Sequence, residues 1–111
     1  MKIKLNYKNK SIEIPKIKKV TELGKIKGLM FTTSSTTPLL FDFQTPTKIS
    51  IHSFFVFYPF LAIWLNENKI VDFKIVHPFK LAVTPKQPFT KLIEIPINNK
   101  NKNIINFIVG K

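Results

Sequence analysis

The chain has 111 residues with 18 basic and 6 acidic side chains, no cysteine and a net charge of +12. This length fits one domain with one hydrophobic core, and the lack of cysteine excludes disulfides, thiolate metal sites and a thiol nucleophile. All the basic side chains are lysines, so the charge favours attraction to nucleic acid, anionic lipid or an acidic partner without the bidentate contacts that arginine makes.

The N-terminal segment alternates between apolar and polar residues. Ile3, Leu5 and Tyr7 precede a polar turn at residues 8–11, and Ile12 and Ile14 follow it. This pattern predicts a β-hairpin that ends at the next proline. In residues 20–30 the apolar spacing changes to three or four, which predicts the only helix of the chain.

The rest of the chain has the pattern of short strands separated by turns. Residues 32–37 are all serine or threonine and predict a surface loop. Prolines 78, 85 and 88 predict an irregular segment, because proline cannot donate to a sheet ladder. Strands are predicted at residues 39–43, 49–57, 60–65, 69–76, 91–97 and 104–109. The predicted fold is mainly β, a small closed or partly closed barrel or sandwich of about seven strands with one short α-helix.

Several segments resemble a known family in order and spacing. Residues 25–31, Lys-Ile-Lys-Gly-Leu-Met-Phe, look like the Gly-Leu-Met-Phe motif of the domain of unknown function 192 family, also called uncharacterised protein family 0127. Residues 38–43 are similar to its Met-Leu-Phe-x-Phe strand, and residues 51–55 resemble the His-x-Phe-Phe variant of archaeal members. The resemblance spans roughly residues 20–110. It implies a compact β fold with one packed helix, in a family without an established activity.

The sequence departs from this family at two places. Leu61 stands where the family has an acidic residue, and the chain ends at Gly110-Lys111 where the family usually continues with Gly-Asp. Any chemistry that needed the missing carboxylate is therefore absent.

The residues that carry chemistry are few and scattered. His52 and His77 could join a carboxylate around zinc or iron, but their separation fits no local ligand motif, so no metal site is predicted. The serines lie in no nucleophile elbow, and three glycines form no phosphate loop, so we predict neither catalytic residues nor a cofactor. Asp42 and Glu94 lie in apolar strands, where each must face solvent, pair with a lysine such as Lys25, or line a ligand pocket.

These observations leave three hypotheses about function. The first is a non-enzymatic module with a groove or pocket near Lys25, Asp42, His52 and Glu94 for a small ligand or a protein partner. The second is nucleic-acid or polyanion binding through the lysine-rich surface, with phenylalanines available to stack on bases. The third, ranked last, is a metal-dependent or hydrolytic enzyme. The chain is expected to be cytoplasmic and either monomeric or dimeric.

Overall fold

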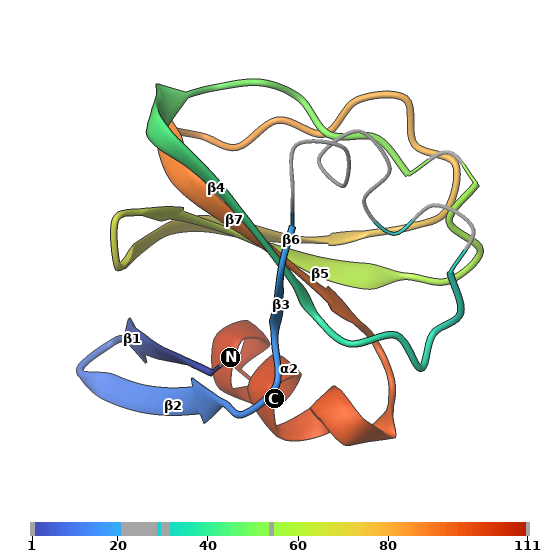
Figure 1. Cartoon of the computed structure of the whole chain (residues 1–111), viewed down its shortest axis with the longest axis horizontal. Coiled ribbons are helices and arrows are strands. Elements are labelled where there is room, and N and C mark those ends of the chain that lie inside the picture. Colours follow the sequence, from blue (N-terminus) through green and yellow to red (C-terminus); the bar gives the residue numbers. More distant parts are fainter. Residues whose placement is uncertain (1, 21–28, 30–31, 54, 111) are drawn as a thin grey trace.

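A computed structural model of the chain describes residues 2–20, 29, 32–53 and 55–110. The strands form one seven-stranded sheet in the order β2-β1-β6-β5-β7-β4-β3, which curls into a half-barrel (Figure 1). The fold is mainly β with one short α-helix in its described part, which confirms the predicted fold class. The elements are β1 (Ile3–Tyr7), β2 (Lys10–Ile14), β3 (Lys18–Lys19), β4 (Leu39–Thr47), β5 (Phe60–Asn66), β6 (Lys69–Val76), β7 (Phe89–Pro96), the 3-10 helix η1 (Asn99–Asn101) and the α-helix α2 (Lys102–Val109).

The N-terminal hairpin is confirmed, with a turn tighter than the predicted one. Tyr7 pairs with Lys10 across a two-residue turn in which Lys8 and Asn9 have φ values of 50° and 63°. Two left-handed residues in succession are typical of the type I′ turn, whose twist matches that of the strands. Asparagine tolerates this conformation, so the hairpin closes without glycine.

Strand β5 lies at the centre of the sheet, between β6 and β7, and supplies side chains to two separate apolar clusters. Leu61 and Ile63 point to one face, while Phe60, Ala62 and Trp64 point to the other, as the two-residue period of a strand requires. Because both faces are buried, this strand is apolar from its first residue to its sixth. The predicted hairpin of residues 60–65 and 69–76 is confirmed as β5 and β6.

The two faces of the sheet are covered differently (Figure 1). On the first, which we call the hairpin face, Leu61 and Ile63 pack in one cluster with residues of the β1–β2 hairpin and of α2. On the second, which we call the loop face, Phe60 and Trp64 pack with residues of irregular segments, among them Val56 and Tyr58. Among the described residues, the hairpin and α2 therefore cover most of one face, and irregular segments pack on the other.

The predicted strand at residues 104–109 is wrong, because these residues form most of α2. Ile104 and Ile108 lie one helical turn apart and are both buried against the hairpin face. Gly110 ends the helix with φ 86° and its N–H bonded to the carbonyl of Asn106, which is a glycine C-cap. None of the helices in the described part of the chain is long and apolar enough to cross a membrane.

The predicted strand at residues 49–57 is also wrong. Within this segment only Ile51 forms a bridge, to Val83, and the remaining described residues are irregular. Strand β4 is longer than predicted, because a register shift between Asp42 and Thr47 accommodates the expected turn as a bulge. The helix predicted at residues 20–30 lies, except for Val20 and Leu29, outside the described residues.

Candidate functional site

The sheet separates the two carboxylates that the sequence singled out. Glu94 of β7 pairs with Leu39 of β4, whereas Asp42 of β4 pairs with Lys91. Positions 91 and 94 are an odd number of residues apart, so their side chains point to opposite faces of the sheet. Glu94 lies on the loop face and Asp42 on the other, and the two do not line one pocket.

The other predicted site residues also lie apart. Asp42 is half-buried, and its Oδ1 accepts a hydrogen bond of 3.0 Å from the N–H of Gln44, which has φ 66° in the bulge of β4. His52 is exposed, one residue after the bridge of Ile51. Lys25 lies outside the described residues, so its expected pairing with a carboxylate stays a prediction. Among the described residues, no three histidine or acidic side chains come together as metal ligands would.

Glu94 is the one of these residues with an unusual environment. Its side chain is 5% exposed, and burial raises its pKa to about 8. The carboxyl is therefore mostly neutral at pH 7, since desolvation disfavours the charged form. Burial likewise raises the pKa of Tyr58, whose hydroxyl shares a hydrogen bond of 2.6 Å with Thr32.

Other buried polar groups on the loop face hold irregular backbone in place. Asp72 accepts hydrogen bonds from the N–H groups of Phe73 and Lys86, and Thr90 accepts one from Glu67. The indole N–H of Trp64, on the same face, has no acceptor in the described part of the chain.

A second feature of the loop face is a pair of loops joined by one serine. Ser53 is fully buried, and its hydroxyl donates to the carbonyl of His77 and accepts from the N–H of Lys80, both at 2.6 Å. Its backbone N–H bonds to the carbonyl of Lys80 and its carbonyl accepts from Phe79. Backbone groups of loops have no sheet partners, so they need other hydrogen bonds such as these. The bonds of Ser53 fix its own loop against residues 77–80.

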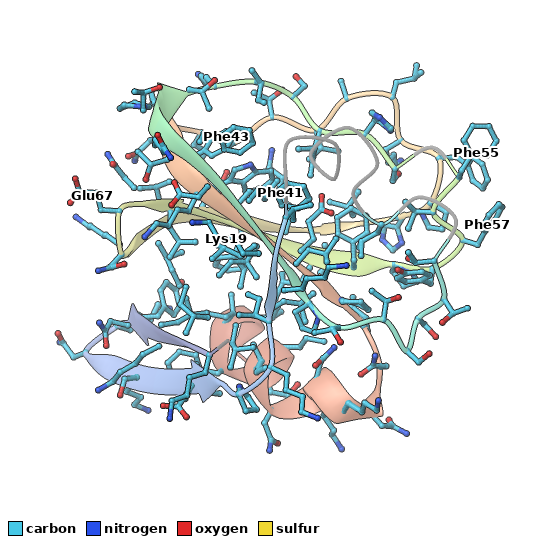
Figure 2. The ribbon with its side chains drawn as sticks, viewed as in Figure 1. Lys19, Phe41, Phe43, Phe55, Phe57 and Glu67 are labelled. Carbon is cyan, nitrogen blue, oxygen red and sulfur yellow. The ribbon has the colours of Figure 1, made fainter. Side chains whose placement is uncertain are left out.

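This pair of loops presents three exposed phenylalanines, Phe55, Phe57 and Phe79, which we call the aromatic tip. Their exposed fractions are 47%, 63% and 49%. Phe79 meets Phe55 and Phe57 edge to face, with centroid distances of 6.5 and 5.4 Å. Figure 2 shows Phe55 and Phe57 at the edge of the molecule, pointing away from its body.

Two residues of the aromatic tip have strained backbone. Phe55 has φ 58° and Phe79 has φ 62°, in the left-handed region that bulky residues rarely adopt. Such outliers persist only where the surroundings fix them, and they concentrate at binding and switch sites. The strain and the exposure of large apolar rings together indicate an interaction surface.

Sequence reasoning found only part of this surface. The aromatic residues between 54 and 64 have the composition of a buried strand pair, so the sequence predicts most of them as core and leaves an exposed binding surface as the alternative. Tyr58, Phe60 and Trp64 are indeed buried, whereas Phe55 and Phe57 are exposed. Phe79 was not among the predicted residues, and only its place in a proline-flanked irregular segment hinted at an exposed position.

Comparisons with known proteins bear on the fold. No family model matches the chain, and no curated protein matches it, so the family resemblance of the sequence stays a prediction. A protein of unknown function from Novosphingobium aromaticivorans DSM 12444 aligns over 91% of this chain and 75% of its own, with a TM-score of 0.70 and 14% identity. A candidate transcription regulator from Sinorhizobium meliloti 1021 aligns over 93% of this chain and 83% of its own, with a TM-score of 0.74 and 13% identity. At such low identity these likenesses show a shared fold and nothing about function.

Proposed function

We propose that this protein is a non-enzymatic binding module that docks its aromatic tip onto an anionic phospholipid surface. The observation that carries this proposal is the rigid presentation of three neighbouring phenylalanines in solvent. Contiguous apolar side chains of this size are rarely exposed on a monomeric protein unless they form an interaction surface. Ile49 and Leu81, on the same two loops, are also exposed and enlarge the apolar area.

The charge of the surroundings supports an anionic partner. Residues 48–66 and 73–93, which include both loops of the tip, contain lysines and histidines but no aspartate or glutamate. Lys48 and Lys80 flank the apolar residues of the two loops, and the whole chain carries +12. Each lysine close to an anionic bilayer contributes about 1 kcal/mol, and apolar rings that enter the interface add to this.

The geometry of the rings favours a bilayer over single-stranded nucleic acid. Bases stack on aromatic faces that lie roughly parallel along a groove. In the aromatic tip, the ring of Phe79 makes angles of 72° with Phe55 and 70° with Phe57, so the three rings do not form such a platform. A convex tip of this kind instead fits a medium that surrounds it, such as the headgroup and acyl boundary of a membrane.

The test is co-sedimentation with vesicles. The wild-type chain should bind phosphatidylcholine vesicles that contain about a quarter phosphatidylglycerol, and bind much less to phosphatidylcholine alone. The double variant Phe55→Ser/Phe57→Ser keeps the charge but removes two rings, and should bind at least about tenfold more weakly. Ile75→Ser, at an exposed position of β6 outside the two loops, is the matched control and should bind like the wild type.

Two outcomes would overturn the proposal. Equal vesicle binding by the wild type and the double variant would mean that lysines alone attract the membrane. Phenylalanine-dependent binding to oligothymidine, without vesicle binding, would instead support the alternative of nucleic-acid binding through the lysine-rich surface. The measurement with oligothymidine is included because the Sinorhizobium structural neighbour is described as a candidate transcription regulator.

A further inference from the structure

A cavity of about 220 Å³ lies away from the aromatic tip, where three distant parts of the chain meet. The end of β2 contributes residues 14–16, the hydroxyl-rich loop contributes residues 35–38, and the start of the C-terminal helices contributes Lys100, Asn101 and Ile104. Two asparagines join these parts. Asn98 donates a side-chain hydrogen bond to the carbonyl of Ser34, and buried Asn101 donates one to the carbonyl of Pro96.

The walls of the cavity divide into an apolar part and a donor-rich part. Ile14, Pro38 and Ile104 are buried and supply the apolar part, and both isoleucines belong to the cluster of the hairpin face. Lys16 and Lys100 supply two ammonium groups from opposite ends of the chain. Ser35, Thr36 and Thr37 of the predicted surface loop also line it, and the Ser35 hydroxyl shares a hydrogen bond of 2.8 Å with that of Thr33.

The electrostatics of the cavity suit an anion. None of the carboxylates in the described part of the chain lines it. Glu13, next to Ile14 in the chain, is exposed and lies 4.0 Å from the ammonium of Lys2. Two lysines and three hydroxyl residues therefore line the cavity, whereas none of the described carboxylates does, and this imbalance of charge favours an anion.

We infer that this cavity binds a small phosphate monoester, with the phosphate between Lys16 and Lys100 and its organic group against the two isoleucines. A phosphate offers three terminal oxygens with two negative charges, which matches two ammonium groups and several hydroxyl donors better than a single carboxylate does. The volume is below the roughly 300–1,000 Å³ of pockets for drug-sized ligands, so the organic group is small. This site is independent of the aromatic tip and goes beyond the proposed docking function.

Phenyl phosphate is the probe for this inference, with inorganic phosphate and phenol as its two halves. In calorimetric titrations at low ionic strength, phenyl phosphate should bind at least about tenfold more tightly than either half, because both walls of the cavity contribute. Amide shifts in proton–nitrogen correlation spectra should concentrate at residues 14, 16, 35–37 and 100–104, since residues 15 and 38 are prolines without an N–H.

The variant Lys16→Gln/Lys100→Gln should weaken phenyl phosphate binding by about tenfold or more, since both charge-assisted contacts are lost. Both lysines are exposed, so this variant keeps the fold. Lys102→Gln is the matched control, because Lys102 is an exposed lysine two residues from Lys100 that does not line the cavity. Equal weakening by the control, or amide shifts spread over the lysine-rich surface, would reduce the effect to general charge attraction and overturn the inference.

Discussion

Both faces of the sheet bury apolar side chains, but different kinds of segment pack against them. On the hairpin face, a β-hairpin and an α-helix satisfy their own backbone hydrogen bonds and present apolar side chains such as Leu5, Ile104 and Ile108. On the loop face, irregular segments need help from buried polar side chains, among them Ser53, Asp72 and Thr90. The irregular segments therefore depend on buried polar side chains, some of which, such as Asp72 of β6 and Thr90 of β7, come from the strands beneath them.

This difference fits the proposal that one side of the molecule stabilises the fold and the other side binds a partner. The hairpin face buries apolar side chains with little strain, as a stabilising core does. The loop face carries the strained backbone of Phe55 and Phe79, the exposed rings of the aromatic tip and the buried acid Glu94. Strain and buried polar groups reduce stability, so their presence on this face supports the proposal that it binds a partner.

The largest effect that we expect is a dependence of the unfolding free energy on pH, caused by Glu94 on the loop face. Its pKa is about 8 in the folded chain and about 4.5 when unfolded, so the folded state holds one more proton between these values. The free energy of unfolding should therefore fall as the pH rises from about 4.5 to about 8, by several kcal/mol in total, and Glu94 should add no further slope above that range. Urea unfolding followed by the fluorescence of buried Trp64, the only tryptophan, measures this.

The variant Glu94→Gln isolates this contribution. It keeps the shape of the side chain but cannot ionise, so it should lose the Glu94 part of the pH slope and be more stable than the wild type at pH 8 and above. Glu13→Gln, at an exposed position of β2, is the control and should keep the wild-type slope. An unchanged slope in Glu94→Gln would mean that Glu94 is charged in the folded state, as it would be if it paired with Lys25.

A smaller effect is expected where the two loops are joined. Ser53→Ala removes the hydroxyl that bonds both to the carbonyl of His77 and to the N–H of Lys80. Leaving these two groups without a partner should cost about 1–3 kcal/mol of unfolding free energy and increase the hydrogen exchange of the Lys80 amide. Ser50→Ala, which removes an exposed hydroxyl bonded to Thr84, should change stability by less than about 0.5 kcal/mol. Equal effects of the two variants would contradict the special role of Ser53.

The contrast between the faces also explains what the sequence could predict. The hairpin β1–β2 follows from alternation and a short turn, and β5–β6 follows from a continuous apolar run, a turn and an alternating strand, which are all local features. The helix α2 was missed because Ile104, Ile105 and Val109 are β-branched and resemble a strand. The signals that could have corrected this were the four-residue spacing of Ile104 and Ile108 and the glycine that follows Val109.

The candidate sites depended on long-range geometry that no local pattern contains. Asp42 and Glu94 are equivalent in sequence context, and only the register of β4 against β7 places them on opposite faces. Phe55 is exposed because bonds between Ser53 and a loop some 25 residues later hold the segment in place. The anion cavity joins segments from the beginning, middle and end of the chain, so its lysines could not be paired in advance.

The smallest effect that we predict concerns Asn98, which joins the hydroxyl-rich loop to the start of the C-terminal helices. Its Oδ1 accepts the N–H of Asn101 at the start of the C-terminal helices, while its amide donates to the carbonyl of Ser34 in the hydroxyl-rich loop. Asn98→Ala should lower the unfolding free energy by about 1 kcal/mol, as the loss of a helix cap does. It should also weaken phenyl phosphate binding, because the loop and the helix that form the cavity are no longer joined. Asn99→Ala, at the exposed next position, should do neither. If Asn98→Ala lost stability but bound the probe normally, the cavity would be held by its apolar walls alone, and Asn98 would be only a helix cap.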